Sequence, residues 1–358
     1  MMKHRGSTMR RRGCLAAYWL AAVVFGIAVT SPQLWAQGTG AAESVLPDPQ
    51  QMVRVEAAVD KALEYLLKHQ YPDGSWPSGK GVNNGINSLC LLAFLGRGHV
   101  PGRGPYQPVV DRAVAFILST QRGDGLYQTP NSWNGVMYEH ALATLAMIES
   151  YGWIPTPQMR QSVQRSVDLI VAVQSPQGGW RYQPAPNDAD LSVTVMQVVA
   201  LRAAQNARLT VPQETIDRAR AYVKSCAAGP GFSYQPGGGP TQAQSAAGAL
   251  SMVLLGGYED PQVQTALKHL QSTDYNPGIG YFWYTNYYAM QAHFQAGGNH
   301  WQAWHPRVRK TLLEIQHDDG SWPGLSEAQY GGEAKCYSTA MGAMTLEVYM
   351  HYLPAYQR

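Results

Sequence analysis

Six stretches of the chain carry apolar residues three or four positions apart, with polar and charged residues between them. In VEAAVDKALEYLLKHQ the apolar side chains fall on one helical face and the charged ones on the other. The pattern recurs in VVDRAVAFIL, MRQSVQRSVDLIVAV, TIDRARAYV, VQTALKHL and VRKTLLEI. It predicts six helices with one solvent-exposed side each. A proline, suited to a first helical turn, stands just before each stretch: Pro49, Pro108, Pro157, Pro212, Pro261 and Pro306.

A more apolar stretch with many small residues follows each amphipathic one. These stretches are GINSLCLLAFLG, YEHALATLAMIES, LSVTVMQVVALRAA, AQSAAGALSMVLLGG, TNYYAMQAHFQAGG and YSTAMGAMTLEVYMHYL. A helix with little charge on any face is surrounded by protein, so we expect these to be inner helices. The two kinds of helix are joined by turns rich in glycine and aromatic residues, QYPDGSW, QRGDGLY, QSPQGGW, CAAGPGFSY, TDYNPGIGYFW and QHDDGSW. The chain is therefore predicted to be all-α and to contain six helical hairpins.

The first and last of these corners share the sequence Gln-x-x-Asp-Gly-Ser-Trp, at Gln70–Trp76 and Gln316–Trp322. Repeated hairpins either stack as an open solenoid or close into a ring, and an open solenoid needs atypical capping repeats at its ends. Matching ends favour closure. We therefore predict an α/α toroid (α6/α6 barrel) over residues 49–358.

The N-terminus predicts export. A basic segment without acidic residues precedes the apolar run CLAAYWLAAVVFGIAVT, and Ala36 offers a small residue at a cleavage point. We expect a signal peptide over residues 1–36, a linker over 37–48 and an extracytoplasmic mature chain, periplasmic or secreted. The alternative is an uncleaved N-terminal membrane anchor, because the run is almost long enough to span a bilayer.

Charge and cysteine content narrow the function classes. Residues 1–36 hold five basic residues and no acidic one, so their removal changes the formal charge from +3 to −2. No basic surface then favours nucleic acid as a partner. The remaining cysteines, Cys90, Cys226 and Cys336, are odd in number and widely spaced, which favours free buried thiols over disulfides.

The corner motifs carry a family resemblance. Gln70–Trp76 and Gln316–Trp322, with the weaker Gln174–Trp180 and Gln121–Tyr127, resemble the QW motifs of squalene-hopene cyclases and protein prenyltransferase β-subunits. Residues 50–358 resemble exported bacterial members of the prenyltransferase/squalene-oxidase repeat family, similar to the squalene cyclase C-terminal domain. The resemblance implies an α/α toroid in which each corner glutamine caps a neighbouring helix. It does not imply one activity, because such toroids serve cyclases, transferases and non-enzymatic modules.

QPAPNDADLSVT is a candidate acid site. Cyclases that protonate an alkene use Asp-x-Asp-Asp, whose middle acid is kept protonated by its surroundings. Asp188 and Asp190 match the first two acids, but Leu191 replaces the third. The alternative is that Asp190 or Ser192 caps the following helix.

YEHALA is a second candidate, with Glu139 and His140 at the start of an inner helix, which in a toroid faces one mouth of the cavity. Carboxylates at such mouths perform acid–base catalysis in glycosidases and lyases. Asp124, Asp274, Glu327 and Glu333 are among the acids that could serve as partners. Alternatively, Glu139 simply stabilises the helix dipole.

EAKCYS resembles the zinc-binding Asp-Gly-Cys-Tyr-Ser of protein prenyltransferases, with Cys336 and Tyr337 in place. Ala334 stands at the aspartate position, and Glu333 is displaced by one residue. We therefore predict no metal site. No nucleotide or phosphate fingerprint is present either, so no cofactor is expected.

The stretch YFWYTNYYAMQAHFQAGGNHWQAWHP is the most aromatic part of the chain. Aromatic rings at this density line cavities for apolar, sugar or cationic ligands, although they also form ordinary core. The candidate ligand-binding residues are Tyr138, Trp283, Tyr284, Asn286, Tyr287, Tyr288 and Tyr337.

The leading functional prediction is an exported toroid whose cavity binds an apolar, isoprenoid or glycan ligand. The first alternative is an enzyme, either terpenoid-cyclase-like or carbohydrate-active, that uses carboxylates at the cavity mouth. The second is a protein-interaction module of the cell envelope. Membrane contact is expected only through an uncleaved N-terminal segment, and the sequence leaves the oligomeric state open.

Overall fold

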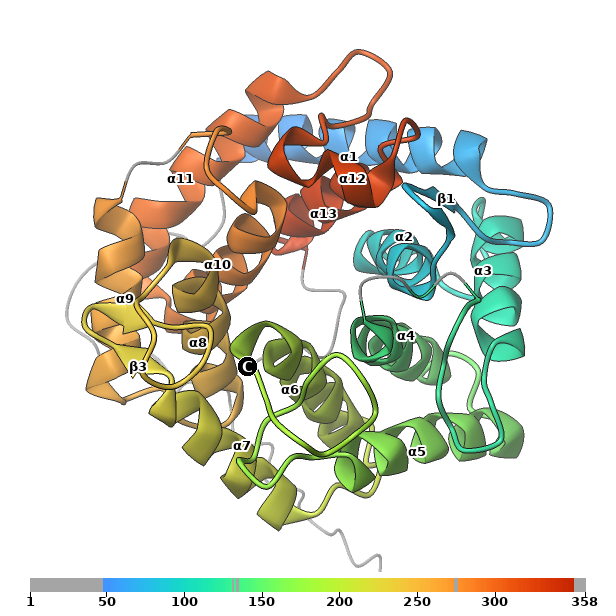
Figure 1. The fold of residues 1–358 in the computed structure, drawn as a ribbon. Helices are drawn as coiled ribbons and strands as arrows, with labels where there is room; N and C mark the ends of the chain where they lie inside the picture. The colour runs from blue at the N-terminus through green and yellow to red at the C-terminus, as the bar shows by residue number, and fades with distance from the viewer. Residues whose placement is uncertain (1–47, 131, 133–134, 274–275, 351–358) are drawn as a thin grey trace, which may run out of the picture. The chain divides into compact units, whose positions relative to one another are not determined.

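The computed structural model describes residues 48–130, 132, 135–273 and 276–350. The predicted signal peptide (1–36), nearly all of the predicted linker (37–48) and the last eight residues of the predicted domain lie outside these ranges. The described residues form a ring of two concentric layers of helices, the predicted α/α toroid (Figure 1). The outer helices are α1 (Pro49–His69), α3 (Gln107–Ser119), α5 (Pro157–Ala172), α7 (Gln213–Ser225), α9 (Pro261–Ser272) and α11 (Gly298–Ile315).

The inner layer consists of α2 (Asn84–Gly96), α4 (Val136–Tyr151), α6 (Leu191–Asn206), α8 (Gln242–Leu254), α10 (Phe282–Ala296) and α13 (Cys336–Glu347). Every residue of α2, α10 and α13 is buried, whereas α1 buries only the side that carries Val55, Val59, Leu63 and Leu66. The low charge of the second helices therefore predicted their inner position correctly. Charged residues are rarely buried without a partner, and they lie mainly on the exposed faces of the outer helices.

The corners hold neighbouring repeats together in a repeated pattern. In the first corner Gln70 Nε2 donates to the carbonyl oxygens of Gly74 and, in the next outer helix, Val109. Trp76 is fully buried and its Nε1 donates to the carbonyl of Leu66. Equivalent bonds run from Gln121 to Ser162, from Gln174 to Thr215 and from Gln316 to Ala58.

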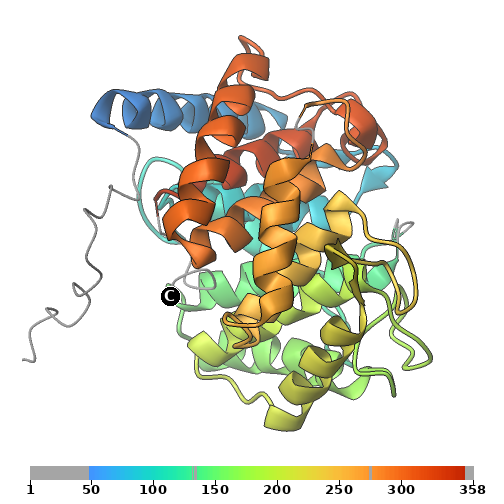
Figure 2. The ribbon, with the colours of Figure 1, turned by 90° about the vertical axis from the view of Figure 1, so that its left-hand side faces the viewer.

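The last of these bonds closes the ring. Gln316 lies in the sixth corner and Ala58 in α1, so the final repeat docks on the first helix just as the first corner docks on α3. Helix α1 packs mainly on α13, and the inner helices contact one another in the order α2, α4, α6, α8, α10, α13 and back to α2. Figures 1 and 2 show α1 beside the C-terminal helices.

Local details differ from the prediction. Pro306 does not begin the sixth outer helix but lies inside α11, which begins eight residues earlier at Gly298. The sixth hairpin also contains a short 3-10 helix, η2 (Leu325–Glu327), and α12 (Ala328–Gly331). Short antiparallel pairs of two-residue strands lie between helices of the described chain. Strand β1 (Pro77–Ser78) pairs with β2 (Gly81–Val82), and β3 (Ala227–Ala228) pairs with β4 (Gly231–Phe232).

The three described cysteines, Cys90, Cys226 and Cys336, are buried and unbridged, as expected from their spacing. Within the described part of the chain, no helix combines the length and the apolar character that crossing a membrane requires.

Candidate functional site

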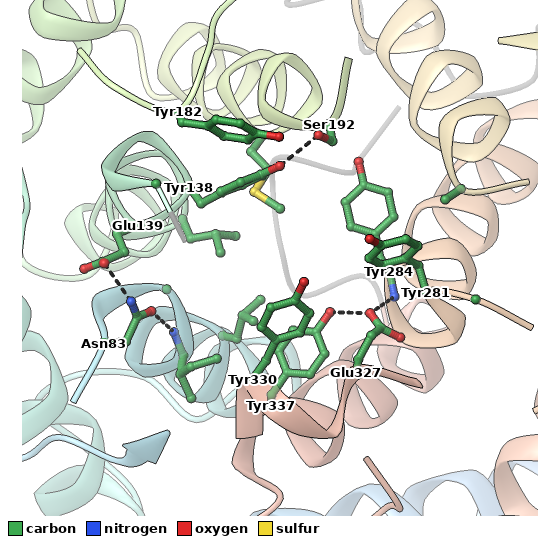
Figure 3. Close-up of a pocket in the computed structure, with 18 of the residues that line it drawn as sticks. Asn83, Tyr138, Glu139, Tyr182, Ser192, Tyr281, Tyr284, Glu327, Tyr330 and Tyr337 are labelled. Atoms are coloured by element: carbon green, nitrogen blue, oxygen red, sulfur yellow. Dashed lines mark hydrogen bonds between the residues drawn. The ribbon is translucent and has the colours of Figure 1, made fainter. Parts of the chain in front are cut away.

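A cavity of about 590 Å³ lies at the centre of the ring (Figure 3). All six inner helices contribute to its wall, mostly from their first two turns, so it sits toward the mouth formed by their N-terminal ends. Among the described residues, seven tyrosines line it: Tyr138, Tyr182, Tyr234, Tyr281, Tyr284, Tyr330 and Tyr337. Ile86, Leu89, Leu142 and Met196 add aliphatic surface.

Glu139 lies on one wall, in the first turn of α4, and is buried. Its Oε1 accepts from Asn83 Nδ2 at 2.6 Å, and its Oε2 accepts from the backbone N of Asn84 at 3.3 Å. Oε2 also accepts from Thr129, from the hydroxyl at 2.8 Å and from the backbone N at 3.3 Å. Glu139 thus accepts a backbone N–H at the start of the neighbouring helix α2. Burial raises its pKa, although these hydrogen bonds oppose the shift.

Glu327 lies on the opposite side of the cavity, at the end of η2, and is likewise buried (Figure 3). It accepts from the backbone N of Trp283 at 2.7 Å and of Tyr284 at 3.1 Å, which are free donors at the start of α10. The Tyr337 hydroxyl donates to the same carboxyl at 2.8 Å. Burial raises the pKa of Glu327 above its ordinary value. Two buried carboxyls therefore each cap an inner helix from across a repeat boundary.

Several tyrosine hydroxyls of the wall form hydrogen bonds with other protein groups. The hydroxyls of Tyr138 and Ser192 are 2.8 Å apart, and those of Tyr182 and Tyr234 contact each other. Burial raises the pKa of Tyr138 and of Tyr337, so both are neutral phenols at physiological pH. The wall consequently offers the cavity aromatic surface more than free polar groups.

Asp190 is the N-cap of α6, the alternative that the sequence offered. Its Oδ1 accepts from the backbone N of Val193 at 2.9 Å and from the Ser192 hydroxyl at 2.6 Å. Its Oδ2 is 3.6 Å from Arg181, which also pairs with the half-exposed Asp188. Neither aspartate is among the described residues that line the cavity; the Arg181 guanidinium stacks instead on the rings of Tyr182 and Tyr234.

His140 is buried away from the cavity and holds a corner in place. Its Nδ1 accepts from the backbone N of Tyr127 at 3.2 Å, and its Nε2 is 3.0 Å from the carbonyl oxygen of Ser166. Burial lowers its pKa to about 4, so the ring is neutral. Polar side chains of other inner helices accept the N–H of the corresponding corner residue in the same way: Asn87, Thr194, Ser245 and Thr339.

The aromatic stretch divides between wall and core. Tyr284 lines the cavity, whereas Trp283, Asn286, Tyr287 and Tyr288 are buried and are not among the described lining residues. Trp283 packs edge-on against Trp322 and donates through Nε1 to the carbonyl of Pro323, and Asn286 donates to the carbonyl of Phe282. Of the predicted site residues, the structure brings four to the cavity: Tyr138, Glu139, Tyr284 and Tyr337.

Several lining residues were not singled out from the sequence. Glu327 was considered only as a possible partner, and Asn83, Tyr182, Ser192, Tyr234, Tyr281 and Tyr330 were not identified as ligand-binding residues. Their common feature is position: each lies between the end of an outer helix and the first turn of the next inner helix. Among the described residues, no cluster of three or more histidine, cysteine or acidic side chains could hold a metal ion.

No protein-family model matches the chain. In sequence, 174 residues are 30% identical to a drimenyl diphosphate synthase of Streptomyces showdoensis, covering 48% of this chain and 31% of that protein. The chain therefore spans about a third of the length of this relative.

Solved structures with the same fold include a terpene cyclase and a mannanase. A variant of the type II terpene cyclase MstE from Scytonema, in complex with its substrate geranylgeranyl dihydroxybenzoate, matches with a TM-score of 0.59 and 12% identity, covering 85% of this chain and 99% of that one. An α-1,6-mannanase from Salegentibacter matches with a TM-score of 0.61 and 10% identity, covering 83% and 99%. The fold is thus a terpenoid-cyclase-like α/α toroid, shared with glycosidases, and the resemblance inferred from the corner motifs is confirmed at this level.

Proposed function

We propose that the central cavity binds an apolar ligand of the isoprenoid class. The observation that carries the proposal is the composition of the wall, in which tyrosine rings and aliphatic side chains enclose about 590 Å³. This volume falls within the range of small-molecule sites, about 300–1,000 Å³, and such sites are mostly apolar with a few placed polar groups.

The hydrogen bonding favours an isoprenoid over a glycan. A sugar needs many donors and acceptors, but the hydroxyls of Tyr138, Tyr182 and Tyr337 already have partners in the protein. Glu139 and Glu327 accept from protein donors through both carboxyl oxygens. Among the described lining residues, the Tyr284 hydroxyl and Gln244 Oε1 lack a partner, so the wall combines a few available polar groups with its apolar surface. That apolar surface gains free energy by covering hydrocarbon.

The comparisons support the same direction. The relative matched in sequence is a drimenyl diphosphate synthase, an enzyme named for an isoprenoid product. MstE and the mannanase match at 12% and 10% identity and therefore support the fold alone.

Ligand binding is tested with purified mature chain. We expect geranylgeraniol and squalene to raise the melting temperature and to bind by isothermal titration calorimetry, and α-1,6-mannotriose to do neither. Leu142→Trp fills part of the cavity and should weaken isoprenoid binding by at least about tenfold, which corresponds to 1.4 kcal/mol. Val53→Trp changes an exposed position of α1 and should bind like the wild type.

Equal affinity of Leu142→Trp and wild type, with both proteins folded by circular dichroism, would place the ligand outside the cavity. Binding of mannotriose alone would favour the carbohydrate-active alternative. If neither ligand class binds while an envelope protein is captured at a defined stoichiometry, the interaction-module alternative replaces the proposal.

We further propose that the mature chain acts outside the cytoplasm. The support is the basic segment followed by an apolar run within residues 1–36. N-terminal sequencing of the protein from a bacterial host's periplasm should give a start near Gln37. An intact N-terminus in the membrane fraction would instead support the anchor alternative.

A further inference from the structure

The charged groups of the cavity wall are all of one sign. Glu139 and Glu327 line the cavity, whereas the described lining residues include no lysine, arginine or histidine. The two carboxyls lie on opposite sides of the space, so a ligand cannot avoid both by turning around (Figure 3).

The hydrogen bonds of both groups suit the ionised form. Every partner of Glu139 in the described structure is an N–H or O–H that donates to it, from Asn83, Asn84 and Thr129. Glu327 likewise receives two backbone N–H groups and the Tyr337 hydroxyl. Hydrogen bonds that a carboxyl group only accepts favour its ionised form. Neither group takes part in an ion pair between described residues that would neutralise it.

The layer behind the wall does not restore the balance. Arg181 stacks on Tyr182 and Tyr234, yet it pairs with both Asp188 and Asp190. This cluster therefore contributes two acids and one base. The tyrosine rings of the wall act in the same sense, because the face of an aromatic ring attracts cations.

We infer that the cavity selects its ligand by charge, preferring a cationic head group on an apolar chain, accepting an uncharged one and rejecting an anionic one such as a diphosphate. This inference rests on the proposed binding of isoprenoids and adds the chemistry of the ligand's polar end. An anion would be desolvated between two carboxylates without a counter-charge, whereas a cation would gain both Coulombic and cation–π attraction.

The test compares three probes that share one geranylgeranyl chain: the alcohol, its trimethylammonium analogue and its diphosphate. Affinities are measured by calorimetry on the wild type at pH 7.5 and low salt. We expect the trimethylammonium probe to bind at least about tenfold tighter than the alcohol, and the diphosphate at least about tenfold more weakly. Added salt should reduce both differences.

Glu139→Gln and Glu327→Gln should each reduce the ratio of the trimethylammonium affinity to the alcohol affinity, because the amide carries no charge. Glu314→Gln is the matched control, since this glutamate is exposed on α11 and should change none of the affinities. If a cavity variant fails to fold, the comparison of the three probes on the wild type still tests the inference. Lowering the pH protonates the carboxyls, so trimethylammonium binding should weaken on acidification while binding of the alcohol stays constant.

Diphosphate affinity equal to or above that of the alcohol would overturn charge selection, as would a cation that gains nothing over the alcohol. Failure of the proposed function gives a different result, in which the uncharged alcohol itself does not bind.

Discussion

Gln316 in the last corner donates from Nε2 to the carbonyl oxygen of Ala58, 258 residues earlier in the chain, at 2.8 Å. The same side chain donates to Gly320 within its own corner at 3.0 Å. Gln121 makes the equivalent pair of bonds to Ser162 and Gly125 inside the ring. The bond that joins the two ends of the toroid is therefore the same bond that joins consecutive repeats.

This equivalence makes closure measurable. Gln316→Ala should lower the free energy of unfolding by about 1–3 kcal/mol, because it removes two hydrogen bonds worth roughly 0.5–1.5 kcal/mol each. Gln121→Ala should cost at least as much, because Oε1 of Gln121 also accepts from the Ser162 hydroxyl and from Arg165. Urea denaturation gives both values, and a silent Gln316→Ala beside a destabilising Gln121→Ala would show that the ring is open in solution.

Gly320 allows the last corner to approach α1 closely. Its φ is +89°, and an added Cβ would lie 2.2 Å from the carbonyl oxygen of Lys61. We expect Gly320→Ala to cost roughly 3 kcal/mol or more, since it combines a left-handed backbone with a clash against backbone.

Gly102→Ala is the control for Gly320. Its φ is similar, at +79°, but an added Cβ would meet nothing within 4 Å. This change should cost only about 1–2 kcal/mol, the penalty for the left-handed conformation. Equal costs in thermal or urea unfolding would show that the corner does not press against α1.

His140 should make stability depend on pH. Its pKa is lowered from 6.5 to about 4, because burial disfavours the charged ring. The folded protein then binds this proton less readily than the unfolded chain, so the contribution is fully present above pH 6.5 and is lost as the pH falls toward 4. The size is roughly 3 kcal/mol at about 1.4 kcal/mol per pKa unit.

The measurement for His140 is the free energy of unfolding of wild type and His140→Asn at several pH values. Asparagine occupies the corresponding position in α2, where Asn87 accepts the corner N–H. The variant should gain on the wild type by roughly 3 kcal/mol between pH 7 and pH 4. A difference that stays constant over this range would contradict a buried neutral histidine.

Glu327→Ala should be strongly destabilising. It leaves the backbone N–H groups of Trp283 and Tyr284 and the Tyr337 hydroxyl without their acceptor. At about 1–3 kcal/mol for each unsatisfied buried group, we expect a loss of roughly 3 kcal/mol or more. Glu314→Ala, at an exposed site, should stay within about 0.5 kcal/mol. A loss below 1 kcal/mol for Glu327→Ala would mean that water or a rearranged side chain replaces this cap.

Asp190 separates a capping role from catalysis. Asp190→Ala removes the acceptor for Val193 N and the Ser192 hydroxyl and a partner of Arg181, so it should cost about 2 kcal/mol or more, whereas Asp190→Asn retains an acceptor and should cost less. Because Asp190 is not among the described lining residues, both variants should bind the isoprenoid alcohol with near wild-type affinity. If a turnover assay on isoprenoids shows activity that Asp190→Asn abolishes while remaining folded, the acid-catalyst hypothesis gains its first support.

The corner motifs were readable from the sequence because they are local. Gln70, Gly74 and Trp76 lie within seven consecutive residues. The indole N–H of Trp76 donates to a carbonyl oxygen of α1, the helix just before the corner. The outer helices were equally readable, since one solvated face leaves a 3.6-residue period. Pro306 misled for the same reason: a proline inside α11 gives the same local signal as a proline at a helix start.

The site was only partly readable. Glu139 was identified, but its partners Asn83 and Thr129 come from other segments of the chain. His140 looked like a catalytic neighbour of Glu139, yet the two side chains leave α4 in different directions, one to the cavity and one to the corner at Tyr127. Adjacent positions on a helix point about 100° apart, so neighbours in sequence need not share a site.

The sequence by itself determined the six hairpins, the inner and outer layers and the closure of the ring, because each depends on periodicity and on motifs within one repeat. Only the tertiary structure decided which tyrosines face the cavity and which pack beside Trp283, and that Glu327 stands opposite Glu139. Those relations depend on how far each inner helix is rotated and shifted against its neighbours. Packing across repeat boundaries sets that rotation, and no single segment of the chain records it.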